Sequence, residues 1–133
     1  MSNYFKKVRN FILDLDLRIV SFDEREELFV VDDEKSGIKN LIIDCEDPIL
    51  ILEQQMFPVP NRAKETPHLF RRLLEMNREL VHGAFVLNSD ASMVIFRDTL
   101  QLENLDLNEL KGSVNALSLG LAEFGNELLG LSK

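Results

Sequence analysis

Two histidines and one cysteine are the side chains of this sequence best suited to metal binding or catalysis near neutral pH. His68 and His82 lie at opposite ends of a predicted helix, about 20 Å apart at 1.5 Å per residue, so they cannot share a metal ion through that helix. Cys45 has no second cysteine with which to form a disulfide or a thiolate metal site. We therefore expect Cys45 to be a small core residue on a strand.

Carboxylates gather at two places, residues 32–34 and residues 44–47. Both groups lie on or beside predicted strand turns, where solvated acidic residues are far commoner than a catalytic carboxylate pair. The sequence contains no glycine-rich phosphate loop, GxSxG elbow, HExxH motif or EF-hand loop. We expect the protein not to be an enzyme, and we expect it to use no cofactor and no metal.

The excess of acidic over basic residues restricts the kinds of partner that the protein can bind. Its 15 Lys and Arg residues stand against 23 Asp and Glu residues, which gives a formal net charge of -8. Nucleic-acid binding depends on clustered basic residues, so we expect no nucleic-acid partner. The acidity has two interpretations, solubility of the protein or attraction of a basic partner segment, and the sequence leaves both open.

Composition predicts one cytoplasmic domain over residues 1–133. Hydrophobic residues make up 45% of the chain and charged residues 29%, which is typical of a globular protein. No apolar run approaches the ~20 residues that a membrane-spanning helix needs, so we expect no membrane association. Lys6, Lys7 and Arg9 are interleaved with apolar residues, which is unlike a signal peptide.

The central elements of the chain follow one another between Thr66 and Leu100. Thr66 and Pro67 predict a helix start, and Gly83 predicts its end. The apolar residues of this helix recur at steps of four, three and four along one face: Leu69, Leu73, Met76 and Leu80. Residues 84–88 and 93–100 are rich in β-branched, aromatic and aliphatic residues, so they predict a hairpin.

Other elements are predicted on both sides of this unit. Apolar spacing predicts a helix over residues 3–15, and residues 27–33, 38–46 and 49–57 predict a three-stranded antiparallel meander. A polar connection over residues 58–65 leads to the central helix. Asp106 and Glu109 form a capping box that opens a long helix with a heptad-like apolar seam.

A second row on the long helix contains Gly112, Ala116 and Gly120 at steps of four. Either the helix packs closely on the sheet there, or it makes a tight helix contact in an oligomer. The full order of elements is α-β-β-β-α-β-β-α. We therefore predict an α+β fold in which the first and last helices cover an antiparallel sheet of about five strands.

The first predicted strand has apolar residues on both of its faces. Phe29 and Val31 lie on one face, and Leu28 and Val30 lie on the other. One layer of helices cannot bury both sets. Phe29 and Val31 are therefore a candidate partner-binding site, and the alternative is that the first helix covers them.

Three phrases of the sequence resemble a known family. They are FDE and LFVVDD within residues 22–33, LLEMN at residues 73–77, and DLNEL at residues 106–110. With the order of elements, they resemble the type III secretion chaperone-like fold, including YbjN-like proteins, over nearly the whole chain. The resemblance implies a small, acidic, cytosolic and dimeric protein that holds an unfolded segment of another protein along apolar patches.

Two functional hypotheses follow from the residues and the resemblance. The first is a non-enzymatic, homodimeric binding module that holds an unidentified protein or peptide by strand addition and in apolar grooves. The alternative is a regulatory or signal-transduction domain of the YbjN type, which acts by contact or by binding a small ligand.

The central helix carries a second apolar row, which predicts homodimerisation. This row contains Phe70, Leu74, Asn77 and Val81. In the chaperones that the chain resembles, this helix and the following strand commonly form the two-fold contact, which would add Phe85 and Leu87 to the interface. The alternative is that the connection over residues 58–65 folds over the row.

Overall fold

The computed structural model of the protein describes residues 2–61 and 64–133, so residues 62 and 63 of the predicted connection lie outside the described residues. Its helices are α1 (Asn3–Asp14), α2 (Thr66–Asn77) and α3 (Leu107–Leu131), with a short 3-10 turn, η1, at Glu34–Ser36. Its strands are β1 (Arg18–Asp23), β2 (Leu28–Asp33), β3 (Ile38–Glu46), β4 (Ile49–Pro58), β5 (Ala84–Leu87) and β6 (Met93–Gln101).

The strands form one antiparallel sheet in the order β1-β2-β3-β4-β6-β5. The predicted α+β class, the meander and the hairpin are confirmed. The sheet has six strands instead of about five, because residues 18–23 pair with β2 and add an edge strand. That strand is exposed at nearly every position, so it lacks the alternation that marks a half-buried strand.

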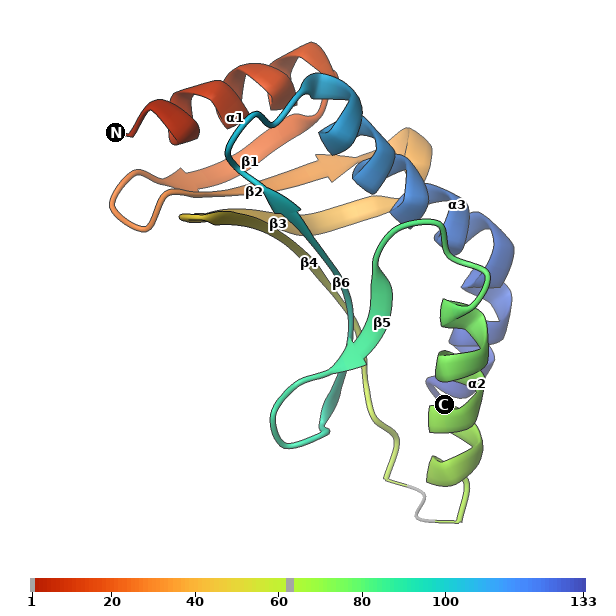
Figure 1. Ribbon diagram of the computed structural model, residues 1–133. Helices are drawn as coiled ribbons and strands as arrows, with labels where there is room; N and C mark the ends of the chain where they lie inside the picture. The colour runs from red at the N-terminus through yellow and green to blue at the C-terminus, as the bar shows by residue number, and fades with distance from the viewer. Residues whose placement is uncertain (1, 62–63) are drawn as a thin grey trace.

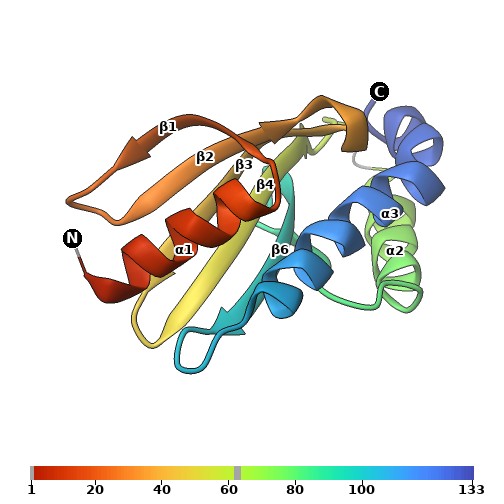
Figure 2. The ribbon, with the colours of Figure 1, turned by 90° about the horizontal axis from the view of Figure 1, so that it is seen from above.

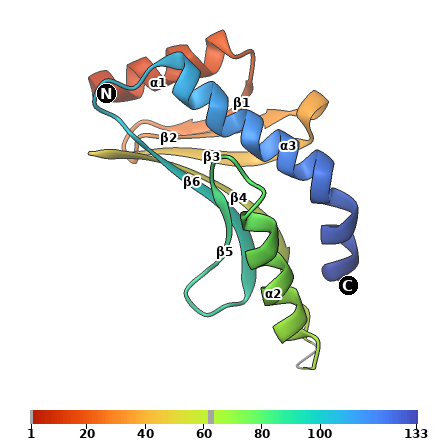
Figure 3. The ribbon, with the colours of Figure 1, turned by 45° about the vertical axis from the view of Figure 1, so that its right-hand side comes forward.

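All three helices lie on the same side of the sheet (Figure 1). Seen from above, α1 crosses the strands near β1 and β2, and α3 runs past β6 toward α2 (Figure 2). The first and last helices therefore cover the sheet, as predicted. The opposite face of the sheet carries no helix in the described part of the chain (Figure 3).

The core lies between this helical layer and the sheet. Alternate residues of the central strands point into it, for example Leu41, Ile43 and Cys45 on β3. Phe5 of α1 stacks on Phe29 of β2 with ring centroids 4.4 Å apart. Stacked aromatic pairs of this kind contribute beyond the area that they bury, so α1 is held firmly on β2.

The central helix ends earlier than predicted. Leu69, Leu73 and Met76 are buried as expected, but α2 stops at Asn77 and the chain turns through residues 78–80. Gly83 therefore lies beyond the helix. It has a positive φ of 75°, and a Cβ atom there would lie 2.5 Å from the Phe96 ring, so both backbone shape and packing require glycine.

The long helix α3 begins with the predicted capping box between Asp106 and Glu109. The row of small residues on this helix, Gly112, Ala116 and Gly120, faces the segment that follows α2. Leu80 Cδ2 lies 3.1 Å from the position of a Cβ at Gly120, and His82 Nε2 lies 3.5 Å from one at Gly112. The row thus allows close packing within the chain, against the residues after α2.

Candidate functional site

The residues with catalytic or metal-binding side chains do not converge. Among the described residues, no group of three or more His, Cys, Asp or Glu could hold a metal ion. Cys45 is buried as predicted, and burial, followed by the nearby carboxylates of Glu27, Asp44 and Glu46, raises the pKa of its thiol to about 12. A thiol with such a pKa is a poor nucleophile near neutral pH. The candidate sites of this protein are therefore surfaces.

The two edges of the sheet differ in their hydrogen bonding. At the β5 edge, the Asn77 side chain accepts a hydrogen bond from Phe85 N at 2.7 Å and donates one to Phe85 O at 3.1 Å. The end of α2 thereby occupies backbone groups that another strand would need. At the other edge, the outer backbone groups of β1 have no strand partner within the described residues. Within the described residues, the β1 edge is therefore open to strand addition, whereas Asn77 blocks the β5 edge at Phe85.

An apolar groove runs beside this open edge, between α1 and β1. It has a volume of about 590 Å³, and its lining includes Phe5, Ile19, Val20, Phe22 and Phe29. The side chain of Phe22 is 58% exposed and that of Val20 is 44% exposed, which is unusual for large apolar residues. We call this site, formed by the β1 edge and the groove, the α1–β1 site.

The structure corrects the candidate partner site at Phe29 and Val31. Both side chains are buried, with exposures of 1% and 0%, because α1 packs over this face of β2. The alternative, coverage by the first helix, is what the structure shows. Phe29 lines the α1–β1 site, whereas the accessible apolar groups belong to β1. The sequence indicates only a short extended segment there and does not predict a strand of the sheet.

The predicted dimer residues separate into three groups. Leu74 and Val81 are 70% and 82% exposed, so the described part of the connection over residues 58–65 does not cover them. Phe70 and Leu87 are half-buried against the core. Phe85 is a correction, because it is 4% exposed and packs edge-on against Phe96. Asn77 is half-buried, and its side chain is hydrogen-bonded to Phe85.

A residue of α3 that the sequence did not single out extends this surface. Leu119 is 66% exposed and lines a groove of about 670 Å³ with Val81 and Leu80 between the end of α2 and α3. In the sequence, Leu119 lies outside the heptad-like seam of the long helix. A leucine at such a position indicates an exposed apolar side chain. Leu74 does not line this groove, but it is exposed on the neighbouring helix α2, and we call Leu74, Val81 and Leu119 together the α2–α3 patch.

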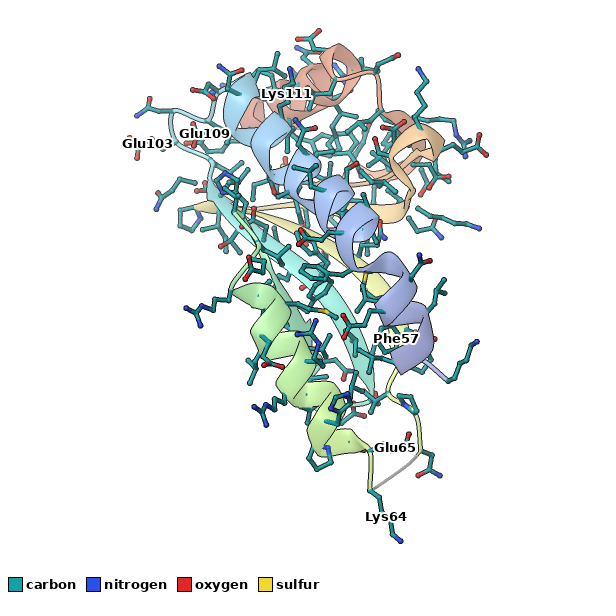
Figure 4. The ribbon with its side chains drawn as sticks, turned by 90° about the vertical axis from the view of Figure 1, so that its right-hand side faces the viewer. Phe57, Lys64, Glu65, Glu103, Glu109 and Lys111 are labelled. Carbon is teal, nitrogen blue, oxygen red and sulfur yellow. The ribbon has the colours of Figure 1, made fainter. Side chains whose placement is uncertain are left out.

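An ion pair fixes α2 against the last part of α3. Arg72 Nε donates to Glu127 Oε2 at 2.5 Å and Arg72 NH2 donates to Glu127 Oε1 at 2.7 Å. Hydrogen bonding to Arg72 lowers the pKa of Glu127, which keeps the pair charged. Figure 4 shows α2 and α3 from this side, with Phe57 labelled beside the end of α3. This ion pair thus links α2 to the last turns of α3.

The described part of the chain contains no helix of the length and apolarity needed to cross a membrane.

The fold is similar to several solved structures. YbjN from E. coli matches with a TM-score of 0.68 and 13% identity, over 92% of this chain and 92% of that chain. The ExsC–ExsE complex matches with a TM-score of 0.62 and 20% identity, over 97% of each chain. The HopA1–SchA chaperone–effector complex matches with a TM-score of 0.60 and 18% identity, over 88% of this chain and 90% of that chain. Identities this low show a shared fold.

A sequence search finds no match among curated proteins. The model of the CesT_Tir_1 family, in contrast, matches residues 1–133, which agrees with the resemblance in the sequence and with the solved structures. Because this match spans the whole chain, the protein belongs to the CesT_Tir_1 family of type III secretion chaperones.

Proposed function

We propose that this protein is a non-enzymatic, cytoplasmic chaperone-like module that holds a segment of another protein at the α1–β1 site. The observation that carries the proposal is the contrast between the two sheet edges. The β5 edge is occupied by Asn77, whereas the β1 edge is open beside exposed Val20 and Phe22. An extended segment would pair its backbone with β1 and place alternate apolar side chains in the groove.

The relatives support a protein partner. The solved structures that share the fold include a chaperone–effector complex, HopA1–SchA, and the ExsC–ExsE complex. Strand addition also suits a partner that is unfolded, because backbone pairing supplies affinity while the groove selects side chains. The bound segment would thereby lose its freedom to aggregate or fold.

We further propose that the working form is a homodimer joined through the α2–α3 patch. Leu74 of α2, Val81 in the segment that follows α2, and Leu119 of α3 are exposed apolar residues. The helices α2 and α3 lie apart from the α1–β1 site (Figure 2). Exposed apolar patches mark association sites, and two-fold pairing is the commonest closed assembly. Each protomer of such a dimer would keep its α1–β1 site free for a partner.

A regulatory domain of the YbjN type is the second candidate function. The matched E. coli protein YbjN is described as a proposed transcription regulator, and its fold agrees with this chain over 92% of both. The net charge of -8 disfavours direct nucleic-acid contact, so such a domain would act through a protein contact or a small ligand. A bound small molecule in place of a protein partner would favour this candidate.

Recovery of partners on a tagged form of the protein from its native cells tests the first proposal. We expect one partner protein to be recovered in stoichiometric amount. Phe22→Asp should abolish recovery, because it places a charge in the groove without entering the core. Leu129→Asp is the matched control, since Leu129 is 65% exposed on the last turns of α3.

The two variants make the outcome decisive. Both should keep the melting temperature of the wild type within a few degrees, because neither residue is buried. If Phe22→Asp recovers the partner as well as Leu129→Asp does, the α1–β1 site is not the binding site. If no protein is recovered and a small molecule is, the chaperone-like function is wrong.

A further inference from the structure

The uncovered face of the sheet is unusually apolar. An antiparallel sheet with one face toward water normally presents polar residues there. Here that face carries seven partly exposed aliphatic residues from β2 to β6: Leu28, Val30, Ile42, Ile49, Ile51, Val86 and Ile95. Strand register places them as neighbours, for example Val30 opposite Ile42 and Ile95 opposite Val86. We call this surface the open face (Figure 3).

A carboxylate lies among these aliphatic residues. Asp44 of β3 is flanked in register by Leu28 of β2 and by Ile51 of β4. Its Oδ1 atom is buried and has no hydrogen-bond partner within the described residues. Burial, followed by the charge of Glu46, a side-chain hydrogen bond with Glu46, and the charges of Glu26 and Glu53, raises the pKa of Asp44 to about 6. The charge of Asp44 is therefore present at neutral pH but poorly stabilised.

The acidic neighbours of Asp44 are only partly neutralised. Glu53 forms an ion pair with Arg97 on the same face. Glu26 and Glu46, in contrast, have no cationic partner among the residues that the structure describes. The open face thus combines aliphatic side chains with an unpaired negative cluster and a buried oxygen that lacks a donor. A cationic group placed over this cluster would offset its negative charge.

We propose that the open face binds a partner segment that presents aliphatic side chains and a lysine or arginine opposite Asp44. This inference rests on the proposed protein-binding function and adds a second contact surface, separate from the α1–β1 site. An aliphatic segment without a cation would bury the Asp44 charge at a cost. A second copy of the chain would bring an identical acidic cluster against this one, and the like charges would repel. The basic amphipathic segment is therefore the occupant that fits.

Nuclear magnetic resonance with two synthetic peptides tests this proposal. One peptide alternates valine and lysine, and the other carries glutamine in place of lysine. The lysine peptide should shift the amide signals of Ile42, Asp44 and Ile51. At the same concentration, the shifts caused by the glutamine peptide should be about half as large or smaller. Asp44→Asn should weaken binding of the lysine peptide about two- to fivefold, the range of a partly exposed ion pair.

Asp14→Asn is the matched control for Asp44→Asn. It removes the same charge from an exposed position at the end of α1, on the other side of the sheet, and should leave binding unchanged. Equal loss in both variants would mean that only the net charge of the protein attracts lysine, and the proposal would be wrong. Equal binding of both peptides would also overturn it.

The location of the shifted signals separates this inference from the proposed function. Shifts confined to α1 and β1 would refute open-face binding and leave the α1–β1 site intact. Shifts on the open face that persist in Phe22→Asp would support the inference even if partner recovery showed that the α1–β1 site is unused. Absence of any shift with the lysine peptide would overturn the inference.

Discussion

Asn77 joins the end of α2 to the edge strand β5 through two hydrogen bonds to one residue. Its amide accepts from Phe85 N and donates to Phe85 O, as a neighbouring strand would. Asn77→Ala should lower the free energy of unfolding by about 1–3 kcal/mol, because partly buried backbone groups lose their partners. Urea denaturation measures the loss, and Asn115→Ala, at an exposed site on α3, is the control. Equal stability of both variants would show that solvent replaces these bonds.

Asp44 gives a prediction about the dependence of stability on pH. Its pKa is about 6 in the folded protein, against an ordinary value of 3.8, so the folded state binds the proton more tightly than the unfolded state. The protonated carboxyl therefore favours folding below about pH 4, and this advantage is lost as the pH rises through about 6. Asp44→Asn should stabilise the protein on the order of 1 kcal/mol near neutral pH, allowing for partial solvent access.

Denaturation of wild type and Asp44→Asn across this pH range measures the effect. The difference between the two proteins should shrink as the pH falls toward about 4, because both then carry a neutral side chain. Asp14→Asn should show no such trend. A constant difference at every pH would mean that Asp44 does not titrate in this range.

For individual residues, the sequence predicts burial more readily than hydrogen bonding. The position of Cys45 on the covered face of a strand was predicted from alternation, and it is confirmed. Helical spacing places Asn77 in the predicted dimer surface, and the family resemblance adds Phe85. Spacing does not show that an asparagine amide is bonded to a strand edge, so these two residues required the structure.

The helix α3 packs against the rest of the protein through its apolar seam, most of whose residues are buried. Leu117 is 2% exposed, so Leu117→Ala should lower the free energy of unfolding by about 2–5 kcal/mol, as truncation of a buried leucine does. Leu129→Ala, at a site that is 65% exposed on the same helix, should change it by at most about 0.5 kcal/mol. Thermal or urea denaturation compares the two, and equal losses would show that the seam is not the buried side.

Element order was predictable because each helix and most strands have a strong local signal. The capping box of Asp106 and Glu109 gave the start of α3, and apolar spacing gave α1. Two features depended on distant contacts. The strand β1 is defined by its pairing with β2, and α2 ends early because the chain turns to bring β5 beside β6. Neither contact is visible in local periodicity.

The whole molecule places different surfaces on different sides. The α1–β1 site lies at one end of the sheet, and α2 and α3 lie near the other end (Figures 1 and 2). The open face is the side of the sheet that carries no helix within the described residues (Figure 3). The proposed partner binding and the proposed self-association would therefore use different residues.

Homodimerisation is expected because the α2–α3 patch exposes three large apolar side chains, with Leu74 at 70%, Val81 at 82% and Leu119 at 66%. Light scattering should give a mass of about 30 kDa, twice the 15.3 kDa of one chain. Leu74→Glu should reduce the mass to that of a monomer, since it buries a charge at the contact. Leu13→Glu, at a site 57% exposed on α1, should leave the dimer intact. A wild-type protein that is monomeric at tens of micromolar would contradict the homodimer.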